Sequence, residues 1–153
     1  MSCKITRRVE NNKFLSFRSL RICLNLFSHF APQIKHRRRK VYAQNLLPCL
    51  LAIAKRKEPL VIESLADFMK SFSKNLQKCL TDGEIMKLVD VFVENLSVEC
   101  AIKRRCSAQN LLSIVDHAAK KDFLFKTIIS KVQDNLCKIH ETNGVLGSLG
   151  LLR

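Results

Sequence analysis

Long apolar stretches are absent from this chain of 153 residues. The longest uncharged apolar run, Leu46 to Ala54, contains Pro48 and is less than half of the roughly 20 residues that a membrane-spanning helix needs. The first 13 residues carry five charged side chains and lack the apolar core of a secretory signal. The sequence therefore predicts no membrane span, and we expect the protein in the cytoplasm, with the nucleus as a second compartment.

Glycine is scarce too, and the chain shows no catalytic arrangement. Three of its four glycines lie at positions 144, 147 and 150 without a following lysine, which excludes a glycine-rich phosphate loop. Cys106 and His117 share a predicted helix, but eleven residues separate them by about 16 Å, too far for a nucleophile and its base. Ser113 and Asp116 cannot converge with His117, because adjacent helical positions point about 100° apart. We therefore expect no catalytic residue, no cofactor and no enzyme.

Paired metal ligands are missing as well. The seven cysteines are irregularly spaced: Cys3, Cys23, Cys49, Cys79, Cys100, Cys106 and Cys137. The closest pair has no histidine nearer than His117, whereas zinc needs clustered ligands. Most of the cysteines fall inside apolar helical patterns, so the sequence predicts reduced, buried thiols and no metal site.

Acidic residues are outnumbered: 13 Asp and Glu face 27 Lys and Arg, for a net charge of +14. Residues 1–58 hold fourteen basic and two acidic side chains, so most of the excess lies there. Because 47% of all residues are apolar, the composition still indicates one folded domain rather than a disordered chain.

Apolar residues recur at helical spacing along almost the whole chain, and none of the segments alternates with a period of two. A basic tail is expected over 1–12 and a helical segment over 13–153. The predicted helices span 14–31, 41–54, 60–76, 83–96, 102–118, 122–137 and, after a turn at 141–144, a partial one at 144–152. Pro48 should bend the second helix near Gln44. The fold class is all-α.

The apolar stripes also predict which residues face inward. In 14–31 they are Phe17, Leu20, Cys23, Leu24, Phe27 and Phe30; in 60–76, Val61, Leu65, Phe68, Met69, Phe72 and Leu76. In 102–118 they are Ile102, Cys106, Ala108, Leu111, Leu112, Val115 and Ala118; in 122–137, Phe125, Ile128, Ile129, Val132 and Leu136. Similar segments recur about every 41 residues, a period typical of stacked helix pairs.

Several short sequence motifs resemble those of a known repeat family. The stretch NLLPCL at Asn45–Leu50, followed by apolar residues and a charged turn, resembles a HEAT repeat. Together with ESLA, EI-x-K-L, NL, RR and SI-x-x-H, in that order, it is similar to the amino-terminal HEAT domain of the huntingtin family over roughly residues 13–152. The resemblance implies an α-solenoid of HEAT-type antiparallel helix pairs, here about three repeats with incomplete ends.

The family resemblance also implies a function. It implies a non-catalytic scaffold for protein partners, concerned with vesicle transport and autophagy. Huntingtins are far longer, and this chain has neither a glutamine tract nor the amphipathic leader of vertebrate relatives, so we expect a fragment. Its partners would include the rest of a larger solenoid, and its uncovered apolar ends predict self-association.

One cluster stands out as a candidate partner site: Lys35, Arg37, Arg38, Arg39 and Lys40, expected in a loop between two helices. It is read as a solvated loop, as a site for an acidic protein, or, less favoured, as a site for nucleic acid, nuclear import or an anionic surface. Replacing its arginines should leave folding intact.

Two further sets of charged residues are expected to have structural roles. Arg104 and Arg105, after Glu99, are expected to orient neighbouring repeats. Glu63 and Asp67 are expected to form a solvated face.

Overall fold

The computed structural model describes the backbone of residues 16–150 and the side chains of residues 16–137 except Phe17. The helices are α2 (Phe17–Phe30), α3 (His36–Ala54), α4 (Pro59–Asn75), α5 (Asp82–Asn95), α6 (Ala101–Asp116) and α7 (Lys121–Gly150), with short 3₁₀ turns η1 (Ala31–Gln33) and η2 (Gln77–Cys79). No strand occurs in this described part. The all-α prediction is confirmed, and the predicted tail 1–12 and the last residues, 151–153, lie outside the described residues.

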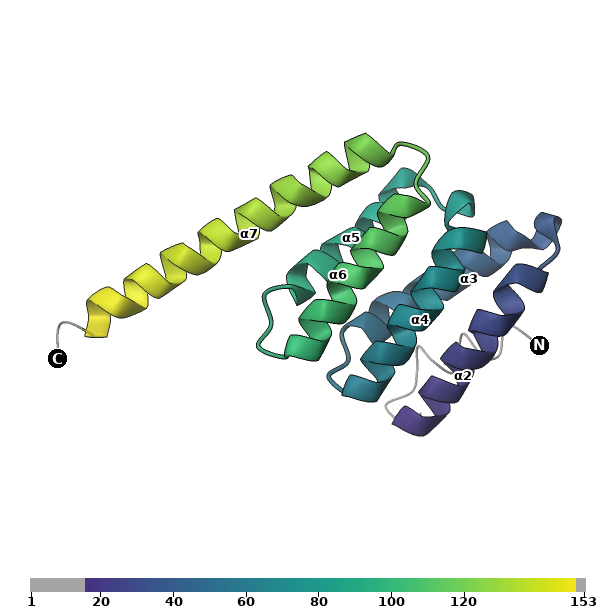
Figure 1. Ribbon diagram of the computed structural model, residues 1–153, viewed down its shortest axis with the longest axis horizontal. Coiled ribbons are helices and arrows are strands. Elements are labelled where there is room, and N and C mark those ends of the chain that lie inside the picture. Colours follow the sequence, from purple (N-terminus) through teal and green to yellow (C-terminus); the bar gives the residue numbers. More distant parts are fainter. Residues whose placement is uncertain (1–15, 151–153) are drawn as a thin grey trace.

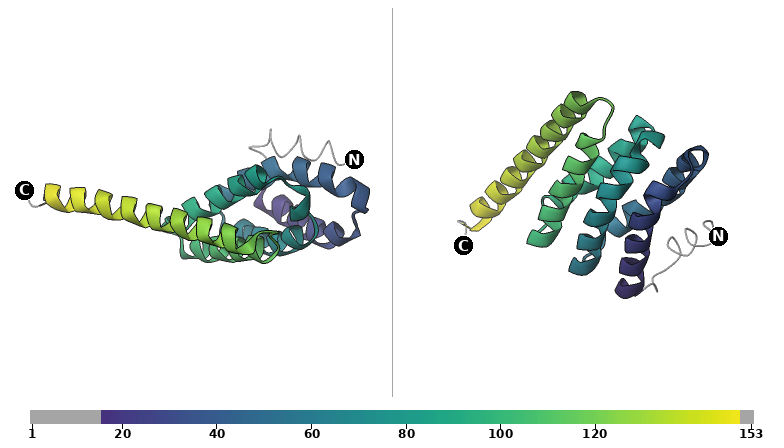
Figure 2. Two further views of the ribbon diagram at one scale, coloured as in Figure 1. Left: turned by 90° about the horizontal axis from the view of Figure 1, so that it is seen from above. Right: turned by 45° about the vertical axis from the view of Figure 1, so that its right-hand side comes forward.

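The helices stack as a solenoid. Helices α2, α4 and α6 lie side by side in one layer and run in the same direction, while α3 and α5 lie behind them and run the opposite way (Figures 1 and 2). The antiparallel pairs α3/α4 and α5/α6 form two complete repeats. A single helix flanks them at each described end, α2 on one side and α7 on the other, so the predicted set of about three repeats with incomplete ends is confirmed.

Helix α4 forms the centre of the core because α2, α3 and α6 all pack against it. Its predicted stripe is buried in full: Val61, Leu65, Phe68, Met69, Phe72 and Leu76. Phe68 contacts Phe27 of α2 edge to face, with ring centres 6.5 Å apart, and its ring centre lies 5.8 Å from that of Phe72. Aromatic packing therefore joins the first two helices of this layer.

The basic segment was expected as a loop, and this expectation is wrong. Helix α3 begins at His36, so Arg37 to Lys40 lie in its first turns and Lys35 is its N-cap residue. Arginine and lysine favour helices, and after the proline turn at η1 nothing between Lys35 and Val41 breaks one. The helix continues through Pro48, which is exposed. The bend near Gln44 stays a prediction.

The C-terminal turn is a second correction. Helix α7 continues through the turn predicted at 141–144 to Gly150 instead of restarting there. Glycine costs only about 1 kcal/mol in a helix and no proline enforces a stop, so an established helix can propagate through these positions. With 30 residues α7 runs well beyond the ends of its neighbours (Figure 1).

Buried polar side chains connect consecutive repeats. The Nδ2 of Asn95, at the end of α5, donates a hydrogen bond of 2.9 Å to the carbonyl of Ala54 at the end of α3. The Nε2 of Gln77 in η2 donates to the Ile114 carbonyl of α6 at 2.7 Å. The last carbonyls of a helix have no partner within that helix, so the bond from Asn95 supplies one across the repeat boundary.

A lysine makes a comparable contact. Lys103 of α6 is 7% exposed, and its Nζ donates at 3.0 Å to the carbonyl of Arg56 in the α3–α4 turn. Burial, which disfavours the charged form, lowers the pKa of Lys103 below its ordinary value of 10.5. The contact therefore keeps a desolvated cation between two repeats.

Replacement of Asn95 by alanine should lower the free energy of unfolding by about 1–3 kcal/mol, because it removes the donor to a buried carbonyl. Urea denaturation measures this change. The matched control is Asn25→Ala on the exposed side of α2, expected to change stability by less than about 0.5 kcal/mol. Equal effects of the two changes would show that the repeat boundary does not depend on this bond.

Lys103 predicts a pH dependence. Its folded pKa is lower than its unfolded pKa, so between the two values the unfolded chain binds more protons and stability rises with pH. The free energy of unfolding of the wild type should therefore increase relative to Lys103→Met as the pH approaches 10.5. Lys74→Met, at the exposed end of α4, is the matched control for the removal of a lysine charge. A wild-type advantage that stays constant or falls with pH would contradict the burial of this charge.

Candidate functional site

The predicted basic cluster lies at the start of α3. Lys35, Arg37, Arg38 and Lys40 are exposed, whereas Arg39 is half-buried. The Nε of Arg39 donates to the carbonyl of Ile34 at 3.0 Å, across the turn that leads into the helix. Four of the five predicted side chains are thus available to a partner, and the fifth has a structural contact.

The positive charges of this cluster lie at the end of the helix where they are electrostatically unfavourable. The N-terminus of a helix carries partial positive charge, and the first turn of α3 contains no acidic residue. An acidic group nearby is Glu84, at the start of α5. The pKa of Glu84 is lowered mainly by hydrogen bonds from the backbone and side chain of Thr81, with Lys87 and Lys40 adding smaller contributions. Lys40 therefore connects this cluster electrostatically to the next repeat.

The structure also brings together basic residues that are far apart in the sequence. The three turns that join successive repeats, α2–α3, α4–α5 and α6–α7, lie along one edge, which runs from the right-hand side to the upper part of Figure 1. We define the basic edge as Lys35, Arg37, Arg38, Lys40, Lys78, Lys120 and Lys121, all exposed. Within the described part of the chain none of these seven side chains forms an ion pair. Sequence analysis identified only the first four.

Of the two α6 arginines that were expected to orient neighbouring repeats, Arg105 makes such a contact, whereas Arg104 contacts the turn of its own helix pair. The Nη1 of Arg104 donates to the carbonyls of Val98 and Glu99, at 2.8 and 2.6 Å, and so closes the α5–α6 turn. Arg105 reaches back to α4 and lies 3.5 Å from Glu63. Both partners of this pair are substantially exposed, so it orients the repeats more than it stabilises them. Glu63 is therefore part of a repeat contact and not only of a solvated face.

Cys106 and His117, which were considered as a nucleophile and its base, have structural surroundings. Cys106 is buried, and burial raises the pKa of its thiol. The Nδ1 of His117 lies 3.0 Å from the carbonyl of Ser113, one turn back at the end of α6. Among the described residues no three His, Cys, Asp or Glu side chains lie close enough to hold a metal ion. Nor does any described helix combine the length and hydropathy required to cross a membrane.

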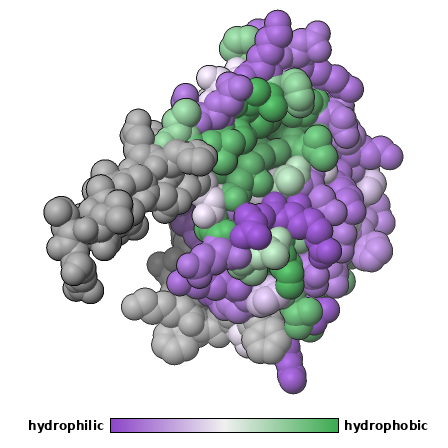
Figure 3. All heavy atoms as spheres, turned by 60° about the vertical axis from the view of Figure 1, so that its left-hand side comes forward, coloured by the Kyte–Doolittle hydropathy of each residue, from purple (hydrophilic) through white to green (hydrophobic). Residues whose placement is uncertain are grey.

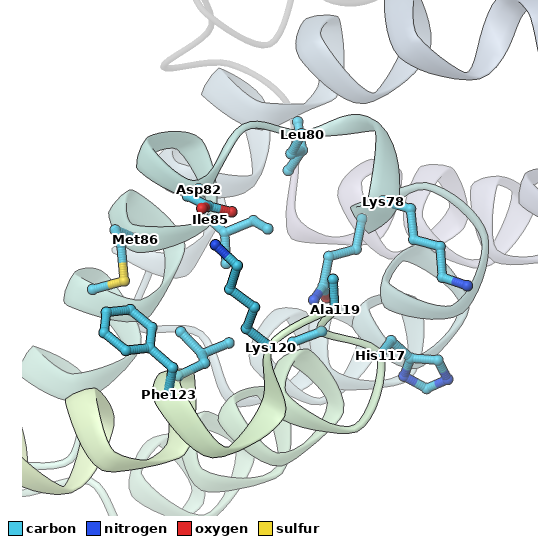
Figure 4. Close-up of a pocket in the computed structure, with 12 residues that line it drawn as sticks. Lys78, Leu80, Asp82, Ile85, Met86, His117, Ala119, Lys120 and Phe123 are labelled. Carbon is cyan, nitrogen blue, oxygen red and sulfur yellow. The ribbon is translucent and has the colours of Figure 1, made fainter.

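A cavity of about 380 Å³ lies on the basic edge and was not predicted from the sequence. It is formed by η2 and the start of α5 on one side, and by the α6–α7 turn and the start of α7 on the other (Figure 4). Its apolar wall consists of Leu80, Ile85, Met86, Phe123 and Leu124. These residues come from two repeats about 40 positions apart, so no local pattern could have indicated the cavity.

The chain is similar to known proteins of one family. The family described as "Huntingtin, N-terminal HEAT 1" matches residues 3–120 of the chain. The chain belongs to this huntingtin family. Huntingtin of Takifugu rubripes is 32% identical over 139 residues, which cover 89% of this chain and 4% of that protein. The chain thus spans a small part of the length of its huntingtin relative.

The family match confirms the resemblance read from the short strings, and the chain is a helical-repeat segment of scaffold type. The matched region contains α2, both complete pairs and the basic cluster at the start of α3. Helix α7, which completes the cavity, lies beyond the huntingtin match of 3–120.

Neutralising the free cations at the start of α3 should stabilise the protein. The triple variant Arg37→Gln, Arg38→Gln and Lys40→Gln keeps helix propensity and removes charge from the wrong helix end, so the free energy of unfolding should rise by about 0.3–1 kcal/mol at low salt. The gain should shrink at high salt. Arg39→Gln is the contrasting variant, expected to lower stability by about 1 kcal/mol because it loses the bond to Ile34. Denaturation curves at two salt concentrations test both, and a destabilised triple variant would overturn this account.

Proposed function

We propose that this chain is a non-catalytic scaffold segment that stacks on further helix pairs and presents its edge and outer faces to protein partners. The observation that carries this proposal is the apolar surface left uncovered at both described ends of the stack. On α2, Ile22, Leu26 and Phe30 recur every fourth residue and are exposed. Side chains at that spacing share one face of a helix, which is the arrangement that a neighbouring helix covers.

The other end shows the same feature. Leu112 of α6 and Phe125, Ile129 and Leu136 of α7 are exposed, and apolar surface gathers on this end of the molecule (Figure 3). Within the stack, α6 packs against α4, its neighbour in the same layer. A helix pair placed after α7 would cover these side chains in the same way, because each repeat in a solenoid buries its stripe against the next.

The finer assignment follows from the family resemblance alone. We propose roles in vesicle transport and autophagy, as implied for huntingtins, and a cytoplasmic location with a nuclear fraction. Expression of the full chain with a fluorescent tag tests the location. Confinement of the tagged chain to a membrane-enclosed compartment would contradict it.

The basic edge supports a second candidate function, binding of nucleic acid or of another anionic surface. Seven exposed cations without described ion pairs can neutralise phosphates. Such binding releases counterions, so affinity should fall steeply between ~50 and 200 mM salt. Titration of a labelled RNA and a labelled duplex at both salt concentrations decides the matter. Absence of micromolar binding at the lower salt would remove this candidate.

The scaffold proposal predicts self-association of the isolated chain at micromolar concentrations, because two uncovered apolar faces can pair. Sedimentation velocity should show species larger than a monomer, and the variant Leu112→Gln, Ile129→Gln and Leu136→Gln should reduce them. Ile22→Gln and Leu26→Gln on α2 test the opposite face separately. A wild-type chain that sediments as a monomer and melts cooperatively would contradict the proposal.

A further inference from the structure

The cavity on the basic edge has the dimensions and the lining of a binding site. Its volume of about 380 Å³ lies within the range of ~300–1,000 Å³ typical of ligand pockets. Figure 4 shows Phe123 next to Met86 at one side, Leu80 at another, and Lys120 extending between them toward Asp82. Two rigid helices, α5 and α7, supply most of its apolar wall.

The apolar wall is incompletely covered. Leu80 and Leu124 are buried, Ile85 and Met86 are half-buried, and Phe123 is 69% exposed. An aromatic ring exposed at the mouth of a cavity leaves apolar surface in water that a bound apolar group would remove. Methionine beside it can adapt to groups of different shape. These features fit a single bulky aliphatic or aromatic side chain.

The rim has the charge that complements an anion. Lys78 and Lys120 are exposed and have no ion pair among the described residues, against one carboxylate, Asp82. The helices that begin here, α5 and α7, point their positive ends toward this region. The basic edge then continues to Lys40 and the arginines of α3. An acidic segment could therefore run from the cavity along the edge.

The cavity wall also contains a buried amide. Gln77 forms part of the cavity wall, and its Nε2 is used in the bond to the Ile114 carbonyl. Its Oε1 is buried and has no hydrogen-bond partner in the described structure. Buried polar atoms are normally paired.

We propose that this cavity binds an acidic peptide segment of a partner protein through one bulky apolar anchor residue. The anchor packs against Phe123 and Met86, and Asp or Glu residues beside it pair with Lys78 and Lys120. The inference deepens the scaffold role proposed above and rests on it. It assigns the partner a chemistry, an anchor flanked by carboxylates, and assigns the contact to the edge rather than to the end faces of the stack.

Fluorescence anisotropy of labelled peptides on the full chain tests the proposal. One peptide carries a central phenylalanine between acidic residues, a second has alanine in its place, and a third keeps the phenylalanine between lysines. The first should bind, the second at least about tenfold more weakly, and the third not at all. A short single-stranded DNA serves as an anionic competitor. If the alanine peptide or the DNA binds as tightly as the phenylalanine peptide, the site reads charge alone and the cavity assignment is wrong.

The chain offers matched variants for the protein side. Phe123→Ala should weaken binding by about tenfold, whereas Phe125→Ala, an exposed phenylalanine of the same helix outside the cavity, should not. Likewise Lys120→Glu should weaken binding more than Lys121→Glu, because only Lys120 lines the cavity. All four positions are exposed, so folding should be preserved, and circular dichroism checks it. Equal effects within either pair would overturn the proposal.

Self-association separates this inference from the one on which it rests. If no acidic peptide binds while the chain still associates through its end faces, the cavity assignment fails and the scaffold proposal stands. If the peptide binds to a chain that remains monomeric, the stacking proposal fails although the cavity is a binding site.

Discussion

The structure depends on one packing constraint. Each helix carries an apolar stripe that its partner in the pair covers only in part, so the stripe is completed by the helix of the next repeat. Helix α4 satisfies this constraint fully because α2 and α6 lie on either side of it. The complete burial of Phe68, Met69 and Phe72 follows from that position. Among the described residues no helix covers the outer side of α2 or of α7, and apolar residues are exposed there.

Polar contacts keep the stacked pairs in register. Apolar packing is not directional, and hydrogen bonds are. The bonds from Asn95 to Ala54 and from Gln77 to Ile114 each join two repeats through a side-chain donor and a backbone carbonyl. Lys103 makes a similar contact with the α3–α4 turn. Such bonds allow only one offset between neighbouring pairs, so they determine how the turns align along each edge.

The alignment of the turns gives the basic edge its positive charge and its cavity. Because the helix faces are used for stacking, charged residues collect at the turns, and three turns of the same kind lie along one edge. Cations that are unfavourable at the start of α3 thus lie on the same edge as Lys78 and Lys120. The same alignment brings η2 beside the start of α7 and forms the cavity between them. Surface and cavity are both products of the repeat spacing.

Local patterns were sufficient where a helix is covered on all sides or has strong end signals. The stripe of α4 was predicted residue by residue, and the capping box of Thr81 and Glu84 begins α5 close to the predicted position. Local sequence patterns gave wrong predictions where the packing of neighbouring helices determines the structure. The basic segment at the start of α3 was predicted as a loop because of its charge, yet arginine and lysine favour helices and the segment continues into the buried turns of α3. In α7 the predicted stripe is split: Ile128 is buried, whereas Phe125, Ile129 and Leu136 are exposed.

The amino-acid sequence alone therefore determined the helical class, the repeat period and the excess of positive charge. The helical class follows from the spacing of apolar residues, the period from the recurrence of similar segments, and the charge from composition. The offset between repeats, the alignment of Lys40, Lys78 and Lys120, and the cavity beside Phe123 emerged only in three dimensions. These features join residues about 40 positions apart, and their distance in space depends on how one helix pair packs against the next.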